Sequence, residues 1–402
     1  MPSDRPDRRR VVVVGGGIVG SAVALGLADL GMPVTLIDQT GPGSGGLVAG
    51  AATAASFGSI SAFGHHQAGD YELACTGMAS WARWAKRLGG QDRVGYVRGG
   101  QLRWTVGAAA GEALTQRVRD AQQVGYPVHL ISEAELSRLL PGARLGPVSA
   151  ACHASEDAQA DPEPVLAACH AALGEAGVRL LRGESARVRV TRDHDGVEIE
   201  AGGEVWHPSV TVLAAGAASM AVAAATGLEV PLVASPGLLV VTAPLAPLLG
   251  GVVYPPVESG APAVCLRQRA DGAVLVAEGS PEQAASDLSN RHARRLLAQA
   301  ARFLPALARV AIREQAVAWR PMPADRLPIV GPVPGLESLY LAVAHRGVTL
   351  APVLGELVAR ELAEGTAERM LAPFRPARFQ TRAVEAMLDV EAVFHRPPPA
   401  GH

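Results

Sequence analysis

The chain has 402 residues, which is long enough for two domains. Its 36 basic and 38 acidic side chains nearly balance, so the charge gives no reason to expect a nucleic acid as partner. The four cysteines, Cys75, Cys152, Cys169 and Cys265, have no metal-type spacing, and this usage is typical of free thiols in a reducing cytoplasm.

Residues 11–38 predict a strand, a glycine-rich turn, a helix and a second strand. The glycines stand at G-x-G-x-x-G spacing, at Gly15, Gly17 and Gly20. The first makes a tight turn, the second lets the backbone approach a pyrophosphate, and the third lets the helix pack closely on the strand. Asp38 ends the second strand, where a carboxylate can accept hydrogen bonds from an adenosine ribose. This order of features predicts a dinucleotide site.

Other interpretations of this segment are weaker. Arg8–Arg10 before an apolar run resemble a secretion signal, but glycines interrupt the run and a clean second strand follows it. Asp29 and the glycines also argue against a membrane helix, and no later stretch is long and uninterrupted enough to predict one. A purely structural strand–helix–strand unit remains an alternative.

Small residues dominate the next segment, 41–61. It is either a low-complexity linker or a backbone-rich stretch beneath a flat cofactor, and its position directly after residues 11–38 favours the second. His65 and His66 are interpreted as solvated loop residues, and an amphipathic helix is expected over 68–88.

The rest of the chain alternates between strand and helix patterns. Strands are predicted at 99–106, 178–182, 186–191, 196–200, 210–219, 237–242, 252–254, 263–269, 273–278 and 312–319. Helices are predicted near 110–124, 132–140, 161–176 and 290–304. A turn-rich stretch is expected at 320–333, a strand, loop and helix at 339–365, and a surface helix with a proline-rich tail over the last twenty residues.

Three separated motifs point to a known family. They are the first glycine motif with Asp38, the central VLAAGAAS, and RPMPADRLPIVGP followed by HRGVTLAP. Together they resemble the D-amino-acid-oxidase-like (DAO) family of FAD enzymes, which includes glycine oxidase, sarcosine oxidase and D-amino-acid dehydrogenases. The resemblance implies an α/β (α+β) fold of the glutathione-reductase type, in which a sheet-based substrate domain is inserted into a Rossmann-like FAD-binding domain. The FAD domain would comprise 8–95, 154–226 and 319–372, the substrate domain 96–153 and 227–318, and a tail 373–402.

The resemblance also implies contacts with FAD. Gly15, Gly17, Ile18, Val19 and Gly20 would meet the pyrophosphate and Asp38 and Gln39 the ribose. Arg187 or Val188 would touch the adenine through the backbone. Thr53, Ala54, Ala55, Ser56 and Gly58 would pass the flavin ring, and Ala215 and Gly216 would flank the diphosphate. Arg346, Gly347, Val348, Thr349 and Leu350 would offer backbone N–H groups to the pyrimidine end, where a helix N-terminus stabilises negative charge. Relatives with covalent flavin use a His in the first loop or a late Cys, so FAD is expected to be non-covalent here.

The chemistry that the resemblance implies is oxidation beside an amine. A flavin accepts a hydride from that carbon, and water hydrolyses the resulting imine. Arg320 matches the family arginine that binds an α-carboxylate, a task that suits a guanidinium fork; a structural ion pair is the alternative. The tyrosine that several relatives place opposite this arginine falls at Cys265, and Tyr254 is a poor substitute.

The electron acceptor is expected to be O₂. Lys86 does not match the lysine with which sarcosine-oxidase relatives promote that step, so His345 and Arg346 are the nearest candidate cations. A packed loop histidine is an equally fair interpretation of His345.

The expected function is thus an FAD-dependent oxidoreductase of a small amine or amino acid, placed in the cytoplasm with no membrane partner, and with homo-oligomerisation left open. Three alternatives remain. They are a dehydrogenase of the same family with another electron acceptor, an NADPH-dependent flavin monooxygenase, and a non-catalytic flavin-binding subunit of a heteromeric oxidase.

Overall fold

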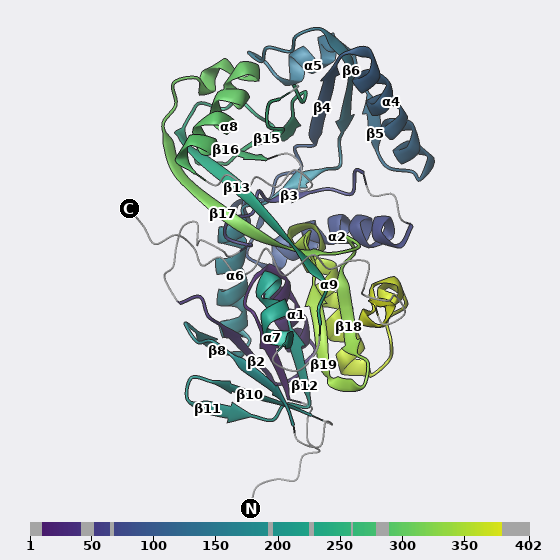
Figure 1. Ribbon diagram of the computed structural model, residues 1–402, viewed down its shortest axis with the longest axis vertical. Coiled ribbons are helices and arrows are strands. Elements are labelled where there is room, and N and C mark those ends of the chain that lie inside the picture. The colour runs from purple at the N-terminus through teal and green to yellow at the C-terminus, as the bar shows by residue number, and fades with distance from the viewer. Residues whose placement is uncertain are drawn as a thin grey trace, which may run out of the picture.

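The structure is a computed structural model with two large β-sheets, one in the lower and one in the upper half of Figure 1. It describes residues 10–41, 52–64, 68–191, 196–224, 229–258, 260–278 and 289–379. The parts of the expected segment 41–61 and of the expected C-terminal helix that fall at 42–51 and 380–402 lie outside the described residues, as do His65 and His66.

The lower sheet has six strands. Their order is β18 (Ile329–Val333), β19 (Leu336–Val343), β12 (Val210–Leu213), β1 (Val11–Val14), β2 (Val34–Asp38) and β8 (Arg179–Arg182). All neighbours pair in parallel except β18 with β19. The four valines of β1 are buried because the strand lies inside the sheet and is covered on both faces, as its unbroken run of β-branched residues predicts.

Helices cover one face of this sheet. They are α1 (Ile18–Asp29), α6 (Pro162–Glu175) and α9 (Gly347–Glu364), and α2 (Ala68–Arg87) packs on α9. Helix α1 packs between α6 and α9. A Cβ atom added to Gly26 of α1 would collide with the carbonyl oxygen of Gly355 in α9, so these two glycines allow the helices to touch.

A small antiparallel sheet covers the other face, together with α7 (Ser219–Ala224). Its strands are β9 (Arg187–Val190), β10 (Val197–Ala201) and β11 (Glu204–Trp206). Ile199 and Trp206 pack there against the side chains of Val12 and Val14.

The upper sheet has eight strands. Their order is β17 (Ile312–Pro323), β13 (Leu232–Pro244), β16 (Ala273–Glu278), β15 (Val264–Gln268), β14 (Val252–Tyr254), β4 (Gln101–Val106), β6 (Val148–Ala154) and β5 (Val128–Leu130). One face packs on α5 (Glu133–Leu139) and α8 (Asn290–Phe303). The other face carries α4 (Ala108–Gln123) at the β5 end and is open towards the lower sheet elsewhere. Strands β13 and β17 form a long antiparallel pair that reaches from the upper sheet towards the lower one (Figure 1).

Short elements complete the described chain. They are α3 (Gln91–Val94), the paired strands β3 (Ser59–Ile60) and β7 (Ala158–Gln159), and the 3₁₀ turns η1 (Gly216–Ala218), η3 (Pro305–Leu307), η4 (Arg369–Phe374) and η5 (Pro376–Phe379). Among the helices of the described residues, none has the length and apolar character needed to span a membrane.

The two sheets confirm the predicted fold class. The expectation that 320–333 is turn-rich is wrong, because its ends belong to β17 and β18 and only the residues between them form a turn. Both strands are sheet edges, where prolines such as Pro321 and Pro332 can be accommodated. The division into two domains remains a proposal, and β17 runs unbroken across its boundary between 318 and 319.

Candidate active site

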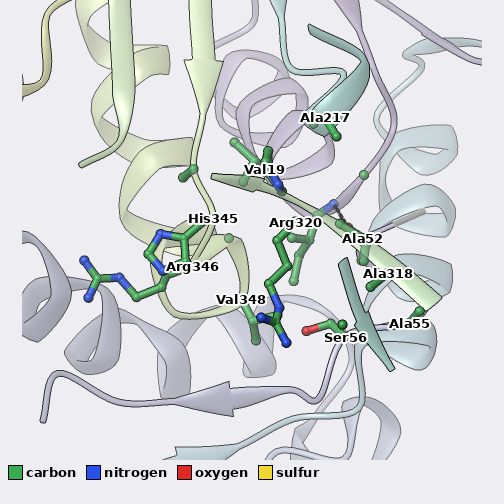
Figure 2. Close-up of a pocket in the computed structure, with 18 of the residues that line it drawn as sticks. Val19, Ala52, Ala55, Ser56, Ala217, Ala318, Arg320, His345, Arg346 and Val348 are labelled. Carbon is green, nitrogen blue, oxygen red and sulfur yellow. Dashed lines mark hydrogen bonds between the residues drawn. The ribbon is translucent and has the colours of Figure 1, made fainter. Parts of the chain in front are cut away.

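A cavity of about 1790 Å³ lies between the two large sheets. Its lower wall contains the ends of β1, β2 and β12 and the start of α9, and its upper wall contains β13, β15, β16 and β17. Figure 2 shows part of this lining, with Arg320 reaching into the space from β17.

The N-terminus of α1 forms one end of the lower wall. Gly15 has a φ of +106°, a conformation that favours glycine, and a Cβ atom at Gly20 would overlap the Gly15 carbonyl oxygen. The turn can therefore bring α1 directly onto β1. Gly17 caps α1 without a side-chain hydrogen bond, and the backbone of Ile18 donates to Oγ1 of Thr53 at 3.1 Å. The positive end of α1 thus faces the cavity, as an anion site requires.

Asp38 closes the same end. Its carboxylate accepts hydrogen bonds from the backbone N–H groups of Gly16 and, at 2.5 Å, of Thr40. His170 on α6 donates from Nε2 to the carbonyl of Gly16 at 3.0 Å, and burial lowers the pKa of this histidine. Asp38 and Gln39 line the cavity, so the carboxylate predicted to meet a ribose is at the wall.

Residues 52–58 line the cavity as a turn held from both sheets. Gly58 has a φ of +80° and lies against the carbonyl oxygen of Ala160. Arg267 of β15 donates from Nε to the carbonyl of Phe57 and from Nη1 to Asp161 at 2.7 Å. This guanidinium is almost completely buried, and burial lowers its pKa while Asp161 opposes that shift. A buried ion pair therefore fixes the segment that was expected to pass the flavin ring.

The loop before α9 forms the opposite side. Trp81 donates from Nε1 to the carbonyl of Val348 at 2.9 Å, and Thr349 donates to the carbonyl of Ser59 at 3.4 Å. Arg346 forms an ion pair with Asp70 at 2.5 and 2.6 Å, and burial lowers the pKa of this arginine. In Figure 2 the Arg346 side chain extends away from Arg320, so its charge is compensated outside the centre of the cavity.

Arg320 occupies the space between the walls. It pairs with Ser235 in the sheet, and its guanidinium crosses Gly237, where an added Cβ atom would lie 2.8 Å from Cζ. Its Nη1 atom is buried and has no hydrogen-bond partner among the described residues. Burial lowers the pKa of Arg320, with Cys265, Glu278 and Tyr254 as the nearby groups that oppose this. In Figure 2 the guanidinium lies between Ser56 and Val348.

Most of the predicted site residues meet at this cavity. Those in its lining are Gly15, Gly17, Ile18, Val19, Asp38, Gln39, Thr53, Ala54, Ala55, Ser56, Gly58, Ala215, Gly216, Arg320, His345, Arg346, Gly347, Val348 and Thr349. Gly20 and Leu350 lie behind the wall. Arg187 and Val188 are not at the wall either: Arg187 is exposed, Val188 is in the core, and the preceding Ser185 and Ala186 line the cavity instead.

Arg103 on β4 is among the charged cavity residues that were not predicted from the sequence. Its neighbours Leu102 and Trp104 are buried on the α8 face, so the alternation of a strand places Arg103 on the cavity face. That alternation is the signal that could have identified it. Tyr254 and Cys265, which matched the family position poorly, both line the cavity as well.

The lining fits FAD. The N-terminus of α1, which Gly17 caps without a side chain, suits a pyrophosphate. The carboxylate of Asp38 at the end of β2 suits a ribose, and the N-terminus of α9 at Gly347 suits the flavin. Within the described residues, no group of three His, Cys, Asp or Glu side chains is arranged to hold a metal ion.

Comparison with known proteins supports this assignment. A family model described as DAO, FAD dependent oxidoreductase, matches residues 10–361. An opine oxidase subunit of Rhizobium meliloti is 25% identical over 93% of this chain and 99% of its own. Glycine oxidase of Geobacillus kaustophilus is 25% identical over 92% and 97%, and its crystal structure superimposes with a TM-score of 0.79 at 23% identity, covering 91% and 98%. The structure of iminodiacetate oxidase from Chelativorans sp. BNC1 gives a TM-score of 0.77 at 25% identity, covering 91% and 99%. The resemblance inferred from the motifs is confirmed.

Proposed function

The chain belongs to the DAO family of FAD-dependent oxidoreductases, and from this premise we propose that it oxidises a small amine that carries a carboxylate. The observation that supports the carboxylate is Arg320, a guanidinium in the cavity with a buried nitrogen that has no partner among the described residues. The names of the relatives agree, because glycine and iminodiacetate both combine an amine with a carboxylate.

FAD supplies an acceptor for a hydride from the carbon beside the amine. The residues of the chain bind and orient. Gly15–Val19 would bind the pyrophosphate at the N-terminus of α1, Asp38 the ribose, and Gly347–Thr349 the flavin through the N-terminus of α9. Each of these contacts uses backbone or carboxylate groups that the fold already holds in place.

Arg320 would fix the substrate. Two parallel N–H···O contacts to one carboxylate set both its position and its angle, which is what alignment of a single C–H bond demands. The neighbouring wall is apolar, with Leu239, Cys265 and Ala277 buried on the cavity side of the upper sheet. Such a wall keeps water away from the reacting carbon, and water hydrolyses the product imine once it is released.

Spectroscopy of the purified, FAD-loaded protein tests this function. Under anaerobic conditions, carboxylated amines should bleach the flavin absorption without any nicotinamide. Bleaching that needs NADPH would instead identify a monooxygenase. If no amine of the panel bleaches the flavin while FAD remains bound, the proposal is wrong and a non-catalytic flavin-binding role is favoured.

We further propose O₂ as the electron acceptor, in line with the word oxidase in the names of several relatives. After anaerobic reduction by substrate, mixing with air-saturated buffer should restore the absorption within about a second and release peroxide. Because Arg346 is paired with Asp70, His345 in the cavity lining is the remaining candidate for the cation that promotes this step. Recovery that takes minutes would indicate a dehydrogenase with another acceptor.

The opine oxidase relative is named as one subunit of its enzyme, and this suggests a second arrangement in which the present chain works beside a partner. Bleaching by the purified chain alone would show that its own cavity completes the first half of the reaction. Bleaching that appears only with a co-purified protein would support the heteromeric arrangement.

A further inference from the structure

We propose that the substrate carries a second acidic group and that Arg103 binds it, while Arg320 binds the carboxylate beside the amine. This inference rests on the proposed function and specifies its substrate class as an amine with two anionic ends. It is carried by the position of Arg103, by its lack of an ion-pair partner and of a hydrogen bond to its Nε among the described residues, and by the surface between the two guanidinium groups.

Arg103 projects from β4 into the cavity. Its Cζ atom lies 4.2 Å from the centroid of the Tyr254 ring, which holds the side chain against the sheet. Its Nε atom is buried without a hydrogen-bond partner, and no carboxylate is among the described groups with the largest effects on its pKa. Burial lowers its pKa, as expected for a cation that has lost water without gaining a carboxylate.

Arg103 and Arg320 approach the same place from opposite sides. The sheet order from one to the other is β17, β13, β16, β15, β14 and β4. Arg320 crosses Gly237 of β13, whereas Arg103 lies over Tyr254 of β14. Burial raises the pKa of Cys265 on β15 to about 12, and the charges of both arginines oppose that shift, so both guanidinium groups lie within electrostatic reach of this thiol.

The surface between them is apolar. Leu239, Cys265 and Ala277 cover the cavity face of β13, β15 and β16. The cavity therefore presents a cation, a short apolar floor and a second cation. Its complement is a molecule with an anion at each end and a few carbon or nitrogen atoms between.

Neighbouring carboxylates do not neutralise this pair directly. Glu278 lines the cavity and contacts Nε2 of His292 at 2.8 Å, and Asp157 accepts a hydrogen bond from the hydroxyl of Tyr126. Both act on the arginines only from a distance, since in the described part of the chain neither forms an ion pair with Arg103 or Arg320. Desolvated cations of this kind are stabilised when an anionic ligand supplies the missing partner.

The phosphates of FAD are a poor alternative occupant for Arg103. The glycine turn and the N-terminus of α1 belong to the lower sheet, whereas Arg103 is on a strand of the upper sheet, near its α4 end (Figure 1). Arg117, an exposed residue of α4, also lines the cavity and adds positive charge at its rim. Charge at the entrance would attract a dianionic substrate.

Redox-inert acids test the inference without turnover. Isothermal titration calorimetry on the FAD-loaded protein should compare dicarboxylates with monocarboxylates of equal length, glutarate with valerate and adipate with hexanoate. At least one dicarboxylate should bind ten-fold or more tightly than the monocarboxylate of the same length. Arg103→Gln should abolish this preference and leave the monocarboxylate affinity within about two-fold, whereas Arg320→Gln should weaken both classes.

Control variants separate a binding role from a structural one. Arg98→Gln removes an exposed arginine that pairs with Glu156, and it should keep the preference. Arg103→Lys retains a cation and should keep part of the preference for dicarboxylates. If Arg103→Gln does not fold, Arg103→Met preserves the apolar part of the side chain and takes its place.

Two results would overturn the inference: equal affinity for both acids in the wild-type protein, or a preference that persists without the Arg103 charge. Neither result depends on flavin reduction. If amines bleach the flavin but dicarboxylates have no advantage, only this inference fails. If dicarboxylates bind better but no amine bleaches the flavin, the proposed function fails instead.

Discussion

Arg320 is the residue on which the proposed chemistry depends most directly. Truncating one partner of a desolvated, hydrogen-bonded charge pair costs roughly 2–5 kcal/mol. Arg320→Ala should therefore lower kcat/KM for a carboxylated amine by about 30-fold or more, while the flavin content changes little. Steady-state kinetics and the absorption ratio of flavin to protein measure the two effects. An unchanged kcat/KM would remove Arg320 from the site and favour a simple amine as substrate.

Gly237 controls where that arginine can lie. An alanine there would place its Cβ atom 2.8 Å from Cζ of Arg320, and the flexible end of the arginine would move rather than the backbone. Gly237→Ala should fold normally and raise KM for the carboxylated substrate several-fold. Gly250→Ala is the matched control, because nothing lies within 4 Å of the added atom. Similar kinetics for the two variants would contradict this role of Gly237.

Protonation of Asp157 makes the free energy of unfolding depend on pH. Burial raises the pKa of this carboxyl to about 6, whereas hydrogen bonding and Arg103 oppose the shift. In the unfolded chain the ordinary value is 3.8, so the folded state takes up a proton as pH falls from 6 towards 4. The protonated carboxyl of Asp157 therefore contributes to the free energy of unfolding at low pH, and this contribution is lost as pH rises through 6.

Asp157→Asn should therefore become more stabilising relative to wild type as pH rises from 4 to 8. The shift of the Asp157 pKa, about two units, corresponds to a change of at most about 3 kcal/mol in the free energy of unfolding. Urea unfolding across this pH range measures the difference, and Asp92→Asn at an exposed position controls for the loss of a carboxylate. A stability difference that is the same at every pH would contradict the burial argument.

At the scale of elements, the first strand, turn and helix carry the pyrophosphate prediction. Gly17→Glu would bring a negative charge to the N-terminus of α1, where an added Cβ atom already lies 3.1 Å from Oγ1 of Thr53. The variant should fold but be purified without flavin. Gly174→Glu, on the exposed side of α6 with open space around it, should remain yellow. Full flavin content in Gly17→Glu would show that the pyrophosphate lies elsewhere.

These elements were also the easiest to predict from the sequence. The run Val11–Val14, the glycine spacing and Asp38 are local patterns, and each corresponds to a local feature of the fold. The stretch 320–333 misled because Pro, Gly and Asp signal turns when taken alone. Its strands exist because β13 and β19 provide long partners, which no local pattern in 320–333 records.

At the scale of the whole molecule, the cavity combines parts that are far apart in the sequence. Arg103, Tyr254, Cys265 and Arg320 lie on four strands of one sheet, although more than two hundred residues separate the first from the last. The family resemblance could assign Arg320 because its motif is continuous. It could not assign Arg103, since that role depends on β4 lying beside β14 in parallel.

The same arrangement bears on how FAD is held. Cys265 is the only cysteine in the lining formed by the described residues, and burial raises its pKa to about 12, which disfavours the nucleophilic thiolate. No His or Cys occurs in the lining segment 52–58. We therefore expect the cofactor to be held by non-covalent contacts alone.

Non-covalent FAD would connect α1, the 52–58 segment, the end of β12 and the start of α9, so its binding should stabilise the whole molecule. At a free concentration one hundred times its Kd, a ligand that binds only the folded state adds about 2.7 kcal/mol. Acid precipitation should release the yellow colour into the supernatant, and FAD added to the apoprotein should raise its melting temperature. Gly17→Glu should show no such rise. Colour that stays in the precipitate would establish a covalent bond.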